Sequence, residues 1–228
     1  RAASAALMLL LVESLKGIAA AKLMPAHTTR KLLHVSAGPL FLATWALWPA
    51  RPTTTTRLSV ALIPAAMTLK FVATGLGFGS EAEVDLMARS GRRSELLRGP
   101  LSYGVVFTVA SALGFRALTA ATALMALCFG DGLADLVGRR FGVRKLPWSS
   151  RKSWAGSLAF VASSVLAGLV TAQYFVVMGW SMVATVRLVL PLFAASTVAA
   201  IVESLPFEDV DNLTAPAAFA AAFHLLTR

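Results

Sequence analysis

The stretch WAGSLAFVASSVLAGLVTAQYFVVM, residues 154–178, contains no charged residue. About 20 apolar residues let a helix cross the hydrocarbon core of a bilayer, so this stretch predicts a transmembrane helix. Further apolar runs occupy residues 2–21, 32–49, 58–78, 101–115, 117–129, 182–202 and 215–226. Because strand-like alternation of apolar and polar residues is absent, we expect an all-α, polytopic membrane helix bundle in a single domain, 1–228, with about seven to eight transmembrane helices.

The composition supports a membrane protein. Hydrophobic residues make up 57% of the chain and the mean hydropathy is +0.72, while charged residues make up only 14%, against about 25% in soluble domains. These values exclude an ordinary soluble globule and a disordered chain, and the single cysteine, Cys128, excludes an internal disulfide. Because the chain begins with Arg1 rather than Met, we expect a processed or partial form whose targeting segment is not visible.

Residues 101–129 decide the number of spans, because they are long for one helix and short for two. Gly114 and Arg116 interrupt them near the middle. If they form two spans, the loops at 22–31, 79–100, 130–153 and 203–214 share one face. That face then carries thirteen cationic residues: Lys22, Arg30, Lys31, Arg89, Arg92, Arg93, Arg98, Arg139, Arg140, Arg144, Lys145, Arg151 and Lys152. The positive-inside rule therefore favours two spans here and eight in total, the last one short.

The net charge of +10 would indicate a nucleic-acid partner in a soluble protein. In a membrane protein it indicates cationic loops and a polyanionic substrate instead, and we expect no nucleic-acid partner. Few charges interrupt the apolar runs. Glu13 and Lys16 are three residues apart, so they share a helix face and are expected to pair.

The segment GDGLADLVGRRFGVRKLPWSSRKSWAG, residues 130–156, begins where an apolar run meets the basic face. If the helix continues for two turns, Asp131, Asp135 and Arg139 form one stripe. Two carboxylates on one stripe suit Mg²⁺, which takes one or two protein carboxylates and completes its shell with water and phosphate oxygens. The cations of this segment could then bind a polyphosphate, namely Arg139, Arg140, Arg144, Lys145 and Lys152. The alternative is a basic loop on anionic lipid head groups.

Two further polar patches flank apolar runs. ESLPFEDVDNLTAP, residues 203–216, could supply a second metal ligand, a general base or nucleotide contacts through Glu208, Asp209, Asp211 and Asn212. Its alternative is a solvated loop in which Asp and Asn are turn residues. RKLLH, residues 30–34, offers Arg30, Lys31 and His34 to phosphate, and its alternative is an ordinary juxtamembrane basic cluster.

Standard nucleotide motifs are missing. The chain has neither a G-x-x-x-x-G-K-[ST] P-loop nor the H-R-D and D-F-G motifs of protein kinases. A small-molecule transporter is an alternative of another class. Transporters usually bind substrates near the bilayer midplane, whereas the polar motifs here lie at the ends of apolar runs, which favours an interfacial enzyme.

The motifs RKLLH (30–34), ELLRGPLSYG (95–104), GDGLADLVGRRFG (130–142), KLPWSSRKSWAGS (145–157) and ESLPFEDVDNLTAP (203–216) together resemble the phytol kinase and farnesol kinase branch of the polyprenol kinases. This branch is related to dolichol kinase and more distantly to the CDP-diacylglycerol synthases. RKSWAGS also resembles the K-T-x-E-G region of the cytidylyltransferases. Ala155 replaces the acidic residue of that region, which favours a kinase over a cytidylyltransferase.

The resemblance implies an integral membrane enzyme of chloroplasts or other plastids that transfers the γ-phosphate of CTP to phytol, giving phytyl phosphate and CDP for tocopherol synthesis. Its partners would be CTP, membrane lipid and phytol, or another prenyl alcohol such as farnesol or geranylgeraniol. We expect Asp131 and Asp135 to hold Mg²⁺ on CTP, and Asp209 or Asp211 to orient or deprotonate the alcohol. The expected nucleotide and phosphate contacts are Arg30, Lys31, His34, Arg139, Arg140, Lys145, Lys152 and Asn212.

Overall fold

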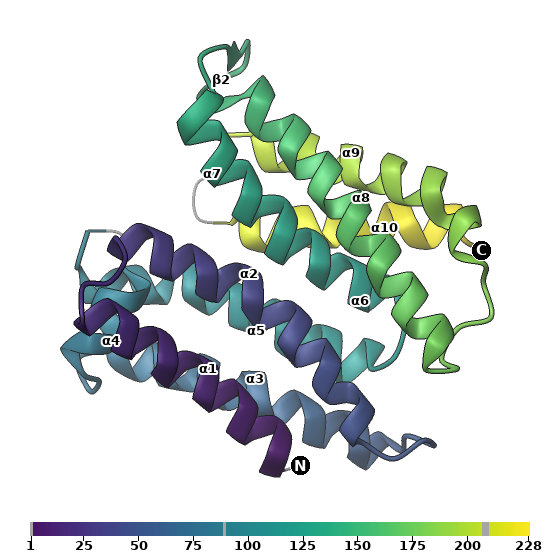
Figure 1. Ribbon diagram of the computed structural model, residues 1–228, viewed down its shortest axis with the longest axis horizontal. Helices are drawn as coiled ribbons and strands as arrows, with labels where there is room; N and C mark the ends of the chain where they lie inside the picture. The colour runs from purple at the N-terminus through teal and green to yellow at the C-terminus, as the bar shows by residue number, and fades with distance from the viewer. Residues whose placement is uncertain (1, 89, 207–209) are drawn as a thin grey trace. The chain divides into compact units, whose positions relative to one another are not determined.

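Helices account for 78% of the chain in the computed structural model, which describes residues 2–88, 90–206 and 210–228 (Figure 1). The α-helices are α1 (Ala2–Ala20), α2 (Ala26–Thr44), α3 (Thr54–Gly75), α4 (Glu81–Met87), α5 (Gly99–Gly114), α6 (Leu118–Met125), α7 (Gly132–Phe141), α8 (Trp154–Val177), α9 (Val189–Ser204) and α10 (Asp211–Leu226). Short 3-10 turns are η1 (Trp45–Leu47), η2 (Arg93–Leu97) and η4 (Thr185–Leu188), and η3 (Ala126–Asp131) is a π-helix. The all-α prediction is confirmed.

Within the described residues, six helical segments are long and apolar enough to cross a membrane: Ala2–Ala20, Thr54–Gly75, Arg93–Gly114, Leu118–Phe141, Trp154–Val177 and Thr185–Ser204. The two other predicted spans form α2 and α10. α2 is more polar, since its first turns carry two histidines, an arginine and a lysine, and α10 has only 16 residues. A polytopic membrane bundle is therefore confirmed, and the spans at α2 and α10 stay predictions.

The chain breaks between α5 and α6, as Gly114 and Arg116 predicted. Arg116 adopts φ = 59°, a left-handed conformation that non-glycine residues rarely adopt and that ends a helix. Its guanidinium lies 4.3 Å from the ring centre of Trp180 and 4.9 Å from that of Phe115. The next helix extends well beyond the predicted residues 117–129, because α6, η3 and α7 follow one another without interruption to Phe141.

Two compact units divide the chain, residues 1–113 and residues 114–228. In the first unit, Val12 and Leu15 of α1 pack with Leu33 of α2 and Leu86 of α4. Trp48 donates an indole hydrogen bond of 3.1 Å to Ser4. The expectation that residues 1–228 form a single domain stays a prediction.

The second unit contains α6 to α10 (Figure 1). These helices pack around the buried side chains of Phe160, Leu192 and Phe219. Small residues let α8 and α9 approach closely: a Cβ added to Gly168 would lie 2.6 Å from Leu192. Hydroxyl groups inside the bundle bond within their own helix, as Thr171 does with the carbonyl of Ala167 at 2.8 Å. Ser164 of α8 and Ser196 of α9 depart from this pattern, because their buried hydroxyls have no hydrogen-bond partner among the described residues.

A small antiparallel hairpin, β1 (Lys145–Leu146) and β2 (Ser149–Ser153), joins α7 to α8 (Figure 1). The sequence did not predict these strands, because the polar residues of β2 lack the β-branched alternation that marks a strand. The pairing Lys145 with Ser153 and Leu146 with Ser149 forms them instead, and Leu146 is buried. Ser153 then caps α8, since its hydroxyl accepts the Gly156 N–H at 3.2 Å.

Candidate active site

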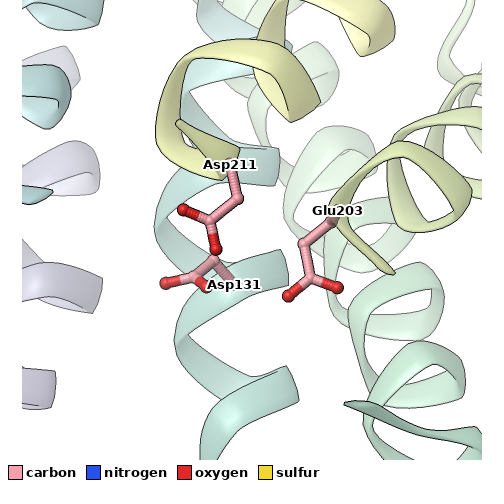
Figure 2. Close-up of side chains that lie close together, drawn as sticks. All are labelled: Asp131, Glu203 and Asp211. Atoms are coloured by element: carbon pink, nitrogen blue, oxygen red, sulfur yellow. The ribbon is translucent and has the colours of Figure 1, made fainter. Parts of the chain in front are cut away.

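Three carboxylates of the second unit converge: Asp131, Glu203 and Asp211 (Figure 2). One oxygen from each lies within 4.8 Å of the oxygens of the other two. They come from three elements, since Asp131 ends η3, Glu203 lies one residue before the end of α9, and Asp211 begins α10. Glu203 is buried and the other two are partly exposed. We call these three residues the carboxylate cluster.

A π-helix delivers Asp131 to the cluster. π-Helical turns are rare and often occur at functional sites. Here the Ser163 hydroxyl of α8 donates to the carbonyl of Phe129 at 3.1 Å. Gly130 permits close contact with α8, because a Cβ at this position would clash with the Ser164 hydroxyl and lie 2.9 Å from Phe160. The glycine of the GDG motif therefore permits the close packing of η3 against α8, immediately before Asp131.

The start of α10 provides Asp211. Its carboxylate accepts the backbone N–H of Asn212 at 3.0 Å. A negative charge is stabilised at this position, because the N-terminus of a helix carries partial positive charge. α9 and α10 pack along each other, and this brings Glu203 at the end of one helix close to Asp211 at the start of the next.

Lys152 is the cation of the cluster. From β2 it donates a hydrogen bond to Glu203, and its Nζ lies 3.7 Å from an oxygen of Asp211. Burial of the ammonium opposes its charged form, but the nearby carboxylates of Glu203, Asp131 and Asp211 outweigh this effect and raise the pKa of Lys152 above its usual value. Among the described residues, three carboxylates thus gather with this ammonium, and carboxylate oxygens grouped in this way are the kind of ligand set that a divalent cation such as Mg²⁺ binds.

Asp135 lies outside the carboxylate cluster. Its carboxylate accepts a hydrogen bond of 2.8 Å from Nε of Arg139, one helical turn further along α7. The structure thus brings Asp135 and Arg139 together as the predicted stripe requires, whereas it places Asp131 with Glu203 and Asp211. The assignment of Asp131 and Asp135 as the two metal ligands stays a prediction.

The other predicted residues of the second unit lie close to these groups in sequence. Arg140 is exposed in the last turn of α7, with its guanidinium 5.6 Å from the ring centre of Phe141. Lys145 is exposed on β1, and Asn212 lies in the first turn of α10. Asp209 and Glu208 lie outside the described residues.

Arg30, Lys31 and His34 lie in the first turns of α2, in the first unit. Lys31 is buried. The carbonyl of His34 accepts a hydrogen bond of 2.7 Å from the Tyr103 hydroxyl, and the two rings lie 4.6 Å apart. In the structure His34 is therefore packed against α5, and its predicted phosphate contact stays a prediction.

Glu203 is the member of the cluster that the sequence reasoning missed. It ends an apolar run, where a long charged side chain can reach the membrane surface, so its position alone does not single it out as a buried site residue. The available signal was the run itself, because an acid within or directly beside a transmembrane segment is costly and marks a functional site by default. Because α7, the hairpin, α8 and η4 separate Asp131 from Glu203 along the chain, their proximity could not be read from spacing.

Comparison with known proteins identifies the family. A probable chloroplastic phytol kinase of Triticum aestivum is 35% identical over 212 residues, which cover 91% of this chain and 70% of the relative. Phytol kinase 1 of Arabidopsis thaliana is 31% identical over 219 residues, covering 94% and 71%. This chain belongs to the phytol kinase and farnesol kinase family. The farnesol kinase of Arabidopsis thaliana, 36% identical over 201 residues, covers 86% of the chain and 64% of the relative.

Membership of this kinase family confirms the resemblance inferred from the motifs. The relatives are described as chloroplastic, and the six long apolar helices agree with membrane insertion, so the chain is a chloroplast membrane protein. No family model matches the chain, and no solved structure does.

Proposed function

We propose that the chain is a phytol kinase that transfers the γ-phosphate of CTP to phytol, with farnesol as the alternative acceptor. The observation that carries this proposal is the carboxylate cluster with Lys152 beside it, in a chain whose relatives are named phytol kinase and farnesol kinase. Phosphoryl transfer depends mainly on positioning and on stabilising charge, and these four residues offer both charge signs at one place.

Asp131 and Glu203 would hold Mg²⁺, with Asp211 as a third oxygen ligand or as the group nearest the alcohol. The donor set fits this ion, because Mg²⁺ prefers carboxylate oxygens and shares its shell with substrate phosphates. When bound, the ion would neutralise negative charge on the phosphate oxygens. Glu203 is 4% exposed, so an ion there would be held away from bulk water on one side.

Lys152 and the cations of α7 and β1 would bind the phosphate chain of the nucleotide. Lys152 occupies the cluster in the structure, and its flexible stem lets it turn from the carboxylates to a phosphate oxygen. Arg139 and Arg140 are exposed on α7, and Lys145 is exposed on β1 of the same hairpin as Lys152. Cations of this kind would bind the nucleotide through its phosphates, while the preference for CTP rests on the family resemblance alone.

In the transfer step, the alcohol oxygen bonds to the γ-phosphorus as the bond from that phosphorus to the β,γ-bridging oxygen breaks. CDP leaves with the electron pair, and the hydroxyl proton passes to a carboxylate. We assign this proton to Asp211, which is 29% exposed and accepts the backbone N–H of Asn212. A long-chain alcohol presents only its hydroxyl to water, and the cluster lies at the ends of α9 and α10, where such a hydroxyl would arrive.

The test is a transfer assay on purified protein in detergent or nanodiscs. We expect label from γ-labelled CTP to appear in an organic-soluble monophosphate when Mg²⁺ and phytol are present. A panel of phytol, geranylgeraniol and farnesol, crossed with CTP, ATP, GTP and UTP, identifies the acceptor and donor together. Release of pyrophosphate with a nucleotide-linked lipid would instead mean cytidylyl transfer, and no labelled lipid with any pair would contradict the proposal.

A further inference from the structure

A tryptophan at the tip of the β-hairpin is attached to the helix that carries Glu203. Trp148 lies in the turn between β1 and β2, and its indole N–H donates a hydrogen bond of 2.9 Å to the hydroxyl of Ser204. Ser204 is buried and directly follows Glu203. The tip of the hairpin and the carboxylate cluster therefore share consecutive residues at the end of α9.

Lys152 provides the second attachment of the same hairpin. It lies four residues after Trp148, on β2, and donates to Glu203. The hairpin thus reaches α9 at two adjacent residues, through Trp148 to Ser204 and through Lys152 to Glu203. Two attachment points fix the rotation of the hairpin as well as its distance from α9, so they keep the backbone of Lys152 beside the cluster while its flexible stem can still reach a phosphate oxygen.

The hairpin needs such support, because an isolated two-stranded hairpin is at best marginally stable. Its ladder is short and irregular between Lys145 and Leu146. Trp148 adds an edge-to-face contact with Trp154 of α8, with the ring centres 6.2 Å apart. Both tryptophans are about half exposed, at 49% and 48%. If their role were only to anchor the protein in the membrane, substitution of either one would have the same effect. The hydrogen bond to Ser204 distinguishes Trp148.

We propose that Trp148 is a positioning residue for phosphoryl transfer, acting through its hydrogen bond to Ser204 to hold Lys152 at the carboxylate cluster. The proposal rests on the proposed function of that cluster and extends it to a residue whose indole N–H bonds to Ser204 and not to the carboxylates. The acting group is the indole N–H, and the contact with Trp154 is secondary.

A double-mutant cycle tests the proposal. Trp148→Phe removes the N–H donor and keeps an aromatic ring beside Trp154, and Ser204→Ala removes the acceptor if the first variant folds poorly. We expect either change to lower kcat about 10-fold, the loss expected for one hydrogen bond to a buried partner. In a Lys152→Met background the same change should have less than about a 2-fold further effect, because residues that act through one another are not additive.

The matched control is Trp154→Phe, an equally exposed tryptophan whose indole N–H has no hydrogen-bond partner within the described part of the chain. We expect wild-type kcat and an unchanged Tm in this control. Equal losses in the Trp148 and Trp154 variants, or a Trp148→Phe loss that persists undiminished in the Lys152→Met background, would overturn the proposal, since a structural or anchoring role predicts both.

Amide hydrogen exchange separates this inference from the proposed function. Trp148→Phe and Ser204→Ala should speed exchange across residues 145–153, and Trp154→Phe should not. If the wild type transferred no phosphate to any alcohol, the proposed function would fail, while the exchange data would still decide whether Trp148 holds the hairpin. Unchanged exchange in both Trp148→Phe and Ser204→Ala overturns the inference even in an active enzyme.

Discussion

At the level of single residues, Glu203 and Asp135 allow two assignments of the metal site to be compared. The motif spacing favours Asp131 with Asp135, and the spatial arrangement favours Asp131 with Glu203 and Asp211. Asp135 has a compensating partner in Arg139 at 2.8 Å, which reduces its value as a ligand. Glu203 is 4% exposed, and a buried carboxylate needs a cation to offset the loss of hydration.

We therefore predict that Glu203→Gln lowers kcat/KM at least about 100-fold, as the loss of a group that organises phosphate charge does, and that it raises the Mg²⁺ concentration needed for half-maximal activity. Asp135→Asn makes the same carboxylate-to-amide change at a residue outside the cluster, and it should lower kcat/KM less than about 10-fold. Both variants are compared by Mg²⁺ titration in the labelled-CTP assay, with Tm as the check on folding. The reverse order of losses would restore Asp131 and Asp135 as the metal pair.

At the level of elements, the π-helix η3 links packing to the site. The stripe of Asp131, Asp135 and Arg139 requires a helix that continues past residue 130, and the helix does continue, but spacing rules assume a regular α-helix. A π-turn inserts extra backbone and changes which residues share a face. Its formation depends on Ser163 and Phe160 of α8, which are far away in sequence. The apolar runs could thus be predicted locally, whereas the grouping of Asp131 with Glu203 could not.

Gly130→Ala tests this element. A Cβ there would clash with Ser164 and press on Phe160, so we expect destabilisation of about 1–3 kcal/mol, the usual cost of overpacking, together with loss of transfer activity as Asp131 shifts. Gly17→Ala in α1 is the matched control, because nothing lies within 4 Å of the added Cβ. In that helix interior alanine should be neutral or stabilising by about 0.5–1 kcal/mol. Equal Tm values for the two variants would contradict the packing argument.

A second element, α4, is tied to its unit by Glu83. The predicted pair Glu13 and Lys16 of α1 is present at 2.8 Å, but the structure adds Glu83, which lies 3.3 Å from Lys16 and 2.6 Å from Lys70 of α3. Burial would raise the pKa of Glu83, yet hydrogen bonds from Lys70, Thr74 and Lys16 outweigh it and lower the pKa from 4.5 to about 2. Glu83 therefore joins α4 to α1 and α3 while it stays ionised.

Because the folded pKa of Glu83 lies below its unfolded value, its contribution to stability is complete above pH 4.5 and is lost as the pH falls toward 2. Glu83→Gln should lower stability at pH 7 by about 1.5–3 kcal/mol, the range for a hydrogen bond to a charged group, and should flatten the acid side of the stability curve. Thermal unfolding from pH 7 to pH 3 measures both effects. Glu13→Gln, at a side chain that is 58% exposed, should change little, and parallel pH curves for wild type and Glu83→Gln would disprove the assignment.

At the level of the whole molecule, the apolar composition and the charge distribution predicted more of the structure than motif spacing did. The apolar runs predicted the helices, and the interruption at Gly114 and Arg116 predicted the break between α5 and α6. These predictions succeed because a segment in the hydrocarbon core must hydrogen-bond its own backbone N–H and C=O groups, which an α-helix does. The hairpin β1–β2 and the burial of Glu203 depend on tertiary contacts, such as the Trp148 to Ser204 hydrogen bond, and had no local signal strong enough to predict them.

The last prediction concerns the orientation of α8 in the membrane, that is, which face each of its ends lies on. The segment before α8 carries Arg139, Arg140, Arg144, Lys145, Arg151 and Lys152, whereas the segment after it carries Arg187. The positive-inside rule therefore places residues 130–153 on the cation-rich face, and 24 residues of α8 place Met182 on the other.

Cysteine labelling can test this, because the chain's single cysteine, Cys128, is buried and leaves a low background. In sealed vesicles of known orientation, an impermeant maleimide should label Ser150→Cys from the cation-rich face and Met182→Cys, at a side chain that is 96% exposed, only from the opposite face. A permeant maleimide, which reaches both, serves as the control. Labelling of both sites from one face would mean that α8 does not cross the membrane.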